Sequence, residues 1–150
     1  REYHFCDETR VEELEKAHRI IELRAYDTVY GIWKYFTVAD EHIDLATQNY
    51  LYIVTLEGYE KMRSYFGADK VVPIYIEVED GQRLMRAIER ERRQGTPKYE
   101  EMCRRFLADA ADFSEEKLKK AGVETRFVNE DFDTTVQEVA SYIRNDIAAD

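Results

Sequence analysis

Arginine is concentrated in one short stretch of an otherwise acidic chain. The 150 residues carry a formal net charge of −10. Most of the clustered positive charge comes from Arg83, Arg86, Arg90, Arg92, Arg93, Arg104 and Arg105. A protein that is acidic overall but carries one dense arginine cluster is suited to a small polyanionic ligand. A nucleotide fits this pattern better than a nucleic acid, because a duplex binder needs many neutralised phosphates.

The spacing of these arginines places several of them on one face of a helix. At about 100° per residue, Arg86 and Arg90 share a stripe that lies opposite Leu84 and Ile88. Like charges four residues apart destabilise an isolated helix by roughly 0.2–0.5 kcal/mol. A bound anion would reverse that sign. A solvated face, on which nearby acidic residues offset the charge, remains the alternative.

Other classes of site are poorly supported by the composition. The two cysteines, Cys6 and Cys103, are too few for a disulfide framework, which favours a reducing compartment such as the cytoplasm. Together with three histidines they offer no zinc-ligand spacing, so no metal site is predicted. No apolar run approaches the ~20 residues of a membrane span. We therefore expect no nucleic-acid or membrane partner.

The elements that position the arginines are predicted from periodicity and from capping residues. Asp7, Asp40, Ser114 and Asp133 are predicted to begin helices. Helices are expected over about 8–17, 40–48, 57–66, 80–94, 98–112 and 114–120, and from 133 onward. In the last helix, the apolar face is expected to be Val136, Val139, Ala140 and Ile143.

Strands are expected over 3–5, 19–26, 33–38, 50–56, 71–77 and 125–128. The run from Tyr50 to Leu56 is continuously apolar, as in a strand buried on both faces. A strand, a helix over 57–66 and a second apolar strand over 71–77 form a β-α-β unit, which implies parallel strands. The predicted fold class is α/β.

The order of short motifs along the whole chain resembles the guanylate kinase family. The motifs, in order, are Glu2-Tyr3-His4-Phe5, Ile21-Glu22, Tyr30-Gly31, Leu56-Glu57-Gly58, Arg86 with Arg90, Arg104-Arg105, and Phe127-Val128-Asn129-Glu130-Asp131. The resemblance implies a three-layer P-loop kinase-type parallel sheet with helices on both faces. It also implies a small mixed or antiparallel GMP-binding lobe over about 1–48. The core would then cover about 49–150, with a helical lid near 86–105.

The resemblance further implies ATP-dependent phosphorylation of GMP to GDP. Tyr3 and Tyr30 match tyrosines that hold the GMP phosphate, and Gly31 follows the second of them. Glu22 matches the carboxylate that reads guanine, whose adjacent N1–H and N2–H₂ groups are both donors. A surface glutamate on an edge strand is the alternative role for Glu22. Thr55 could accept one further hydrogen bond from the base.

Two positions depart from the family pattern. Ile32 stands where a serine or threonine usually follows the Tyr-Gly pair, and it cannot bond guanine O6. Ile53 and Thr55 stand where the family places two aspartates. Base specificity is therefore less firmly implied than the fold, and a kinase for another nucleoside monophosphate is an alternative.

In the family, arginines of the lid clamp the phosphates and stabilise the phosphoryl group in transfer. Arg86, Arg90 and Arg105 occupy the matching positions and are the predicted catalytic residues. Arg90 and Asn129 are also implied as ATP-binding residues. Mg²⁺ would be held mainly through the nucleotide phosphates. The implied partners are GMP and ATP, and the chain would act as a monomer or homodimer.

The phosphate-binding loop GxxxxGK[ST] of such kinases does not occur in this sequence. The chain starts at Arg1, and we expect that it lacks an upstream segment containing this loop. The chain alone is therefore predicted to be inactive as a kinase. The other alternative is a guanylate kinase-like protein-interaction module, which has no working phosphate loop.

Overall fold

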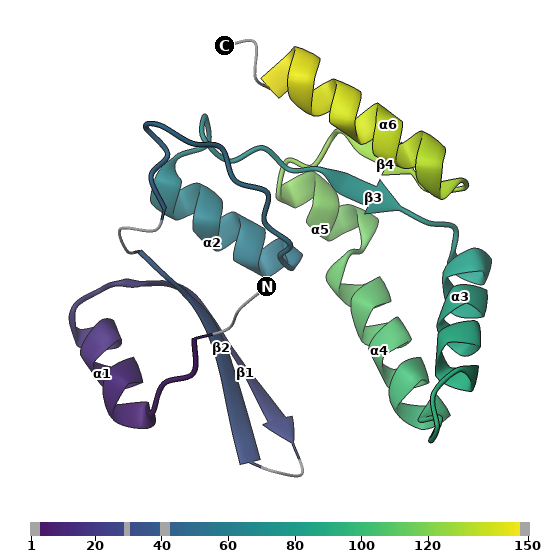
Figure 1. The fold of residues 1–150 in the computed structure, drawn as a ribbon, viewed down its shortest axis with the longest axis horizontal. Helices are drawn as coiled ribbons and strands as arrows, with labels where there is room; N and C mark the ends of the chain where they lie inside the picture. The colour runs from purple at the N-terminus through teal and green to yellow at the C-terminus, as the bar shows by residue number, and fades with distance from the viewer. Residues whose placement is uncertain (1–3, 29–30, 40–42, 148–150) are drawn as a thin grey trace. The chain divides into compact units, whose positions relative to one another are not determined.

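A computed structural model describes residues 4–28, 31–39 and 43–147 (Figure 1). Within these residues the protein is mixed α/β, with one antiparallel and one parallel pair of strands. Two compact units divide the chain at Arg1–Val71 and Val72–Asp150. Each unit has buried apolar side chains of its own, and each is described separately.

Helix α1 (Glu8–Lys16) is the first element of the first unit. Asp7 caps its start, since Oδ1 accepts a hydrogen bond from the Arg10 backbone N–H at 2.9 Å. Val11 and Leu14 are buried. The predicted helix, its cap and its buried face are all confirmed.

The end of α1 is a Schellman motif. The backbone N–H of His18 donates to the carbonyl of Glu15, and that of Arg19 to the carbonyl of Leu14, each at 2.9 Å. His18 has a φ of 52°, in the left-handed region that a side chain rarely adopts. The chain then turns directly into the first strand.

Strands β1 (Ile20–Thr28) and β2 (Gly31–Val38) form an antiparallel hairpin. The strands predicted over 19–26 and 33–38 are confirmed, although both extend further toward the turn. A register irregularity between Ile20 and Glu22 sets Glu22 opposite Thr37. An ion pair between Glu8 and Lys34 ties α1 to β2.

Two predictions near this hairpin are wrong in the part of the chain that is described. His4 and Phe5 lie outside any strand, and Phe5 is almost fully exposed; Tyr3 falls outside the described residues. The predicted helix over 40–48 is only a turn where it is described, with Gln48 N–H donating to the Asp44 carbonyl at 3.0 Å. Asp40 also lies outside the described residues.

The predicted buried strand over 50–56 is also wrong. Residues 50–55 belong to no strand, and Leu51 and Ile53 are each 79% exposed. A strand is defined by hydrogen bonds to a neighbour, and no described segment pairs with this one. An apolar segment of this kind is buried as a strand only when other strands pair with it, and that condition is not met among the described residues.

Helix α2 (Leu56–Phe66) follows at once and confirms the helix predicted over 57–66. Thr55 caps it, because its Oγ1 accepts a hydrogen bond from the Gly58 backbone N–H at 3.3 Å. Its buried side includes Tyr59 and Met62. The helix packs against β1, which brings its first turn beside Glu22.

The second unit contains the parallel pair β3 (Tyr75–Glu77) and β4 (Arg126–Val128). Both strands are shorter than the predicted 71–77 and 125–128. With 50–56 outside any strand, the described residues give a two-stranded parallel sheet rather than the expected central sheet. Arg126 joins β4 to the start of the preceding helix through two 2.7 Å hydrogen bonds to Glu115.

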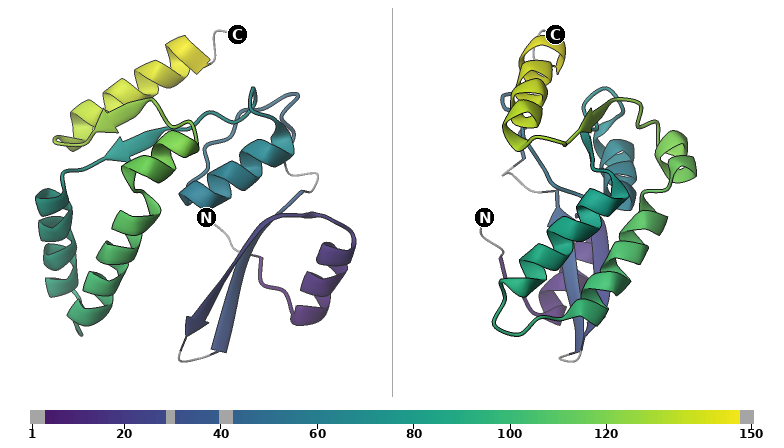
Figure 2. Two further views of the ribbon diagram at one scale, coloured as in Figure 1. Left: turned by 180° about the vertical axis from the view of Figure 1, so that it is seen from behind. Right: turned by 90° about the vertical axis from the view of Figure 1, so that its right-hand side faces the viewer.

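Helices α3 (Asp80–Arg92) and α4 (Tyr99–Asp112) lie side by side, as both views in Figure 2 show. They confirm the helices predicted over 80–94 and 98–112. The Arg83 guanidinium stacks on the Phe106 ring at 4.4 Å, which joins the two helices. Helix α5 (Glu115–Lys120) follows, and the buried apolar side chains of this unit are Met102, Leu118, Ala121, Val123 and Phe127.

Helix α6 (Phe132–Tyr142) packs along β4 and continues into the π-helical turn η1 (Ile143–Ile147). Its cap is Asp131 rather than the predicted Asp133. Val139, Ala140 and Ile143 of the predicted face are partly buried, whereas Val136 is exposed and Thr135 is buried in its place. The Thr135 hydroxyl lies 2.8 Å from the Asp131 carbonyl and 3.3 Å from that of Val128, which favours this orientation.

Candidate functional site

Glu22 is the most buried charged residue that the structure describes, with 2% of its surface exposed. It lies on β1 where the register shifts, and Thr37 is its partner on β2. Side chains two residues apart point to the same face of a strand, so Glu22 and Arg24 share a face. A buried carboxylate needs hydrogen-bond donors around it, since burial without them costs several kcal/mol.

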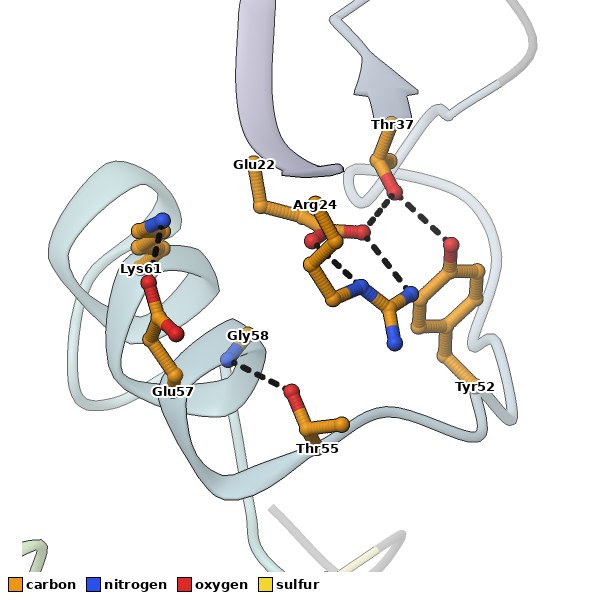
Figure 3. A network of polar contacts seen from close by, with 8 residues as sticks. All are labelled: Glu22, Arg24, Thr37, Tyr52, Thr55, Glu57, Gly58 and Lys61. Carbon is orange, nitrogen blue, oxygen red and sulfur yellow. Dashed lines mark hydrogen bonds and ion pairs between the residues drawn. The ribbon is translucent and has the colours of Figure 1, made fainter. Parts of the chain in front are cut away.

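Arg24 supplies two of these donors (Figure 3). Its Nε lies 3.0 Å from Glu22 Oε2, and its Nη2 lies 3.2 Å from Oε1. The guanidinium therefore contacts both carboxylate oxygens in the bidentate arrangement that makes a strong, directed ion pair. A quarter of the Arg24 side chain stays exposed, so the pair lies at the edge of the buried region.

Thr37 and Tyr52 extend the contacts to a second segment. The Thr37 hydroxyl donates to Glu22 Oε1 at 3.1 Å. The same hydroxyl lies 2.7 Å from the Tyr52 hydroxyl, which belongs to the irregular segment before α2. Glu22, Arg24, Thr37 and Tyr52 thus form one continuous network, which we call the Glu22 network.

The first turn of α2 lies against this network. A Cβ added to Gly58 would lie 3.7 Å from Glu22 Oε2 and 2.3 Å from Val54 Cγ2. Only glycine therefore fits here without movement of its neighbours. Thr55, a predicted base-binding residue, uses its hydroxyl as an acceptor for the Gly58 N–H and retains a proton to donate. The structure brings Glu22 and Thr55 to the same end of α2.

The other predicted GMP-binding residues lie elsewhere or outside the described residues. Tyr3 and Tyr30 are not described. Gly31 begins β2 with a φ of 103° and pairs with Thr28, six positions along the strand from Thr37. At about 3.3 Å per residue this places Gly31 roughly 20 Å from the Glu22 end of the hairpin. The structure does not bring Gly31 next to Glu22. Ile32, which departs from the family pattern, is largely exposed.

Two of the predicted nucleotide residues of the second unit do come together. Arg86 on α3 donates from Nη2 to the carbonyls of Asn129 at 3.1 Å and Glu130 at 3.3 Å, just after β4. The Asn129 N–H in turn donates to the Glu77 carbonyl at 2.7 Å. Its side-chain Oδ1 is buried and has no hydrogen-bond partner in the described structure. Because the atom is buried, a donor from outside the chain could reach it only after neighbouring atoms move.

The remaining lid arginines are exposed. Arg90 lies on the solvent side of α3. On α4, Glu101 accepts hydrogen bonds from Arg104 at 2.7 and 2.8 Å and from Arg105 at 2.7 Å. These bonds, those from Arg104 first and then that from Arg105, lower the pKa of Glu101 to about 2. Arg105 is therefore paired with Glu101 in the structure.

Sequence reasoning missed three members of the Glu22 network. Arg24 could have been found, because its two-residue spacing from Glu22 puts opposite charges on one face of a predicted strand. Thr37 required the exact cross-strand register, which depends on where the hairpin turns. Nothing in the sequence around Tyr52 indicates its contact, since that segment was expected to be a buried strand.

The sequence matches no protein-family model, and searches among curated proteins and among solved structures found no significant match. Within the described residues, no helix combines the length and apolar character needed to cross a membrane. Over the same residues, no group of three or more His, Cys, Asp or Glu side chains is arranged to hold a metal ion.

Proposed function

We propose that this chain supplies the GMP-binding lobe and the lid of an ATP-dependent guanylate kinase, which converts GMP to GDP. The observation that carries the proposal is the burial of the Glu22 carboxylate beside the first turn of α2. Arg24 and Thr37 hold the carboxylate in place, and its two oxygens form an anionic acceptor pair of the kind that can read two neighbouring donors of a ligand.

Guanine is the base that fits such an acceptor pair. It presents N1–H and N2–H₂ side by side, and a carboxylate can accept from both. Adenine presents an acceptor at N1 and would face the carboxylate unfavourably. A site built on buried polar groups discriminates strongly, because the wrong base leaves those groups unpaired. The Thr55 hydroxyl, at the same end of α2, retains a proton for a base carbonyl or ring nitrogen.

Guanine binding requires a local change in the Glu22 network. An ionised carboxylate accepts about four hydrogen bonds. Arg24 supplies two and Thr37 one in the structure, which leaves one position for a base that needs two. We propose that Arg24 is the partner that withdraws, because its side chain is partly exposed whereas that of Glu22 is buried. After that movement the guanidinium would donate to guanine O6, the role that Ile32 cannot fill.

The second unit supports the phosphoryl-transfer half of the proposal. Arg86, Arg90 and Arg105 would neutralise charge on the transferring group, with Mg²⁺ bridging the donor phosphates. Asn129 would contact ATP through its buried, unpartnered Oδ1. The proposal includes a three-layer P-loop kinase-type sheet for the working enzyme, of which β3 and β4 would be the parallel part. It also includes a cytoplasmic location and monomeric or dimeric assembly.

One observation favours a second candidate, a guanylate kinase-like protein-interaction module. Arg24 already occupies both oxygens of Glu22, as in a structural ion pair with no ligand to bind. The retained lid arginines favour the enzyme, since a protein-binding module has no need of them. A kinase for another nucleoside monophosphate is a third candidate, because Ile32 and Thr55 depart from the guanine-reading pattern.

Nucleotide binding to wild-type protein and to Glu22→Gln separates these candidates. Titration calorimetry with GMP and AMP should show GMP binding that falls about ten- to a thousandfold in Glu22→Gln, because one acceptor becomes a donor facing a donor. Glu138→Gln, an exposed change on α6, is the matched control and should bind as the wild type does. Equal GMP affinity in wild type and Glu22→Gln would remove the guanine-reading role. Preference for AMP would favour the third candidate, and no nucleotide binding would favour the module.

A further inference from the structure

We propose that Tyr52 and Thr37 are positioning residues that hold the Glu22 carboxylate in the orientation that distinguishes guanine from hypoxanthine. Because this role assumes that Glu22 reads guanine, it rests on the proposed function. Neither residue contacts the base in this arrangement. Both act through Glu22 Oε1, which Thr37 reaches directly and Tyr52 reaches through Thr37.

The direction of the hydrogen bonds follows from counting protons. Both Glu22 oxygens accept from Arg24, so the carboxylate acts only as an acceptor. The single hydroxyl proton of Thr37 must then point toward Glu22 Oε1. The 2.7 Å contact between the Thr37 and Tyr52 hydroxyls consequently requires Tyr52 to donate. The chain of donors runs from Tyr52 to Thr37 to Glu22.

This series of hydrogen bonds fixes Oε1, the carboxylate oxygen that lies farther from Arg24. Oε2 accepts from the Arg24 Nε at 3.0 Å, whereas the bond from Nη2 to Oε1 is 3.2 Å. If Arg24 withdraws when guanine arrives, Thr37 is the remaining described donor that keeps Oε1 in place. A hydroxyl that itself accepts a hydrogen bond donates more strongly, so Tyr52 reinforces Thr37.

Tyr52 also connects the carboxylate to the start of α2. It lies three residues before the cap Thr55, in a segment that belongs to no strand. Its ring is half exposed, so its hydroxyl contact with Thr37 is the feature that ties this segment to β2. The Tyr52 hydroxyl thus links the carboxylate, through Thr37, to the segment that leads into α2 (Figure 3).

The readout that isolates positioning is the ratio of GMP to IMP affinity. IMP differs from GMP only in lacking the 2-amino group, so contacts with ribose and phosphate cancel in the ratio. A bidentate pair depends on the angle of the carboxylate, whereas a bond to N1–H alone tolerates rotation. Loss of positioning should therefore weaken GMP more than IMP. A loss of folded protein should weaken both equally.

The experiment is titration of the full 150-residue chain with GMP and with IMP, well below its unfolding temperature. Tyr52→Phe should lower the GMP-to-IMP ratio about three- to tenfold, and Thr37→Val about tenfold or more, since Glu22 then loses its direct donor. Thr37→Ser keeps the hydroxyl and should retain most of the ratio. Tyr65→Phe is the matched control, because it removes a hydroxyl from α2 that is not part of the Glu22 network, and it should leave the ratio unchanged.

An unchanged ratio in both Tyr52→Phe and Thr37→Val would overturn the positioning role, while a wild-type preference for GMP would leave the proposed function standing. Wild-type protein that binds GMP and IMP equally would instead overturn the guanine-reading function, and the positioning role with it. Thr37→Ser with the same low ratio as Thr37→Val would also overturn it, because the hydroxyl would then not be the group that matters.

Discussion

Arg24 holds both oxygens of the Glu22 carboxylate, one through Nε and the other through Nη2, within a single strand. The pair spans two residues on one face of β1, with the carboxylate almost fully buried. Replacing Arg24 alone should therefore reduce stability more than replacing Arg24 and Glu22 together. Loss of the arginine leaves a buried charge, whereas loss of both groups leaves an apolar site.

Arg24→Met should destabilise the protein by about 3 kcal/mol, the lower end of the range for breaking a buried pair, because Arg24 is partly exposed. Replacement of both residues in Glu22→Met/Arg24→Met should recover most of this loss. Urea unfolding of the two variants and the wild type measures the difference. A single variant as stable as the wild type would show that Glu22 does not depend on Arg24.

Gly58→Ala should lower the free energy of unfolding although it lies in a helix. Alanine gains up to about 1 kcal/mol of helix propensity. The added Cβ would lie 2.3 Å from Val54 Cγ2, and such overpacking costs about 1–3 kcal/mol. We expect a net loss of up to about 2 kcal/mol in urea unfolding. Addition of Val54→Ala should relieve the contact, and a double variant no better than Gly58→Ala would contradict this cause.

Glu101 should make the stability of the folded protein depend on pH, with stability lost in acid. Its pKa is lowered from an ordinary 4.5 to about 2 by hydrogen bonds from Arg104 and then Arg105. A lowered carboxyl pKa stabilises the folded state above pH 4.5, and the contribution is lost as the pH falls from about 4.5 to 2. Carbon-13 titration of the Glu101 carboxyl should show a midpoint near 2.

Arg104→Gln should raise the Glu101 midpoint more than Arg105→Gln does, because Arg104 donates two bonds and Arg105 one. An ordinary midpoint in the wild type would mean that these exposed side chains do not stay paired in solution.

His18→Gly should stabilise the protein, since His18 occupies the left-handed position of the Schellman motif after α1 with a φ of 52°. Relief of that conformation is worth about 1–2 kcal/mol, and the greater freedom of glycine in the unfolded chain offsets about 0.5–1 kcal/mol. The expected net gain is about 0.5–1 kcal/mol.

The matched control is Gly122, which holds the equivalent position after α5 with a φ of 73°. Gly122→Ala should cost about 1 kcal/mol by the same reasoning. Thermal unfolding should show a higher melting temperature for His18→Gly and a lower one for Gly122→Ala. Stabilisation by Gly122→Ala, or destabilisation by His18→Gly, would show that the left-handed geometry is not the controlling factor.

Local signals predicted most of the elements well. Asp7 and the spacing of Val11 and Leu14 were sufficient for α1, because a cap and a helical period are properties of neighbouring residues. The helix predicted over 80–94 is likewise present as α3, although the residue that caps its start, Glu79, was not predicted. These signals need no knowledge of distant contacts.

Predictions that depended on a distant partner were less successful. The segment 50–56 has the composition of a buried strand, but no described neighbour pairs with it, so Leu51 and Ile53 stay exposed. In α6 most of the predicted face is correct, but Thr135 is buried in place of Val136, and its hydroxyl bonds the carbonyls of Asp131 and Val128. Glu22 was found through the family resemblance. Its contacts with Thr37 and Tyr52 depend on cross-strand register and on an irregular segment, which one sequence does not determine.

The exposed pair Leu51 and Ile53 also bears on colloidal behaviour. Extended apolar backbone outside any sheet is a template for pairing between molecules. The net charge of −10 keeps copies of this chain apart at low ionic strength. Added salt shortens the range of that repulsion to about 8 Å at 0.15 M without weakening the apolar attraction. Light scattering should therefore show self-association that rises with salt, and Leu51→Lys/Ile53→Lys should suppress it.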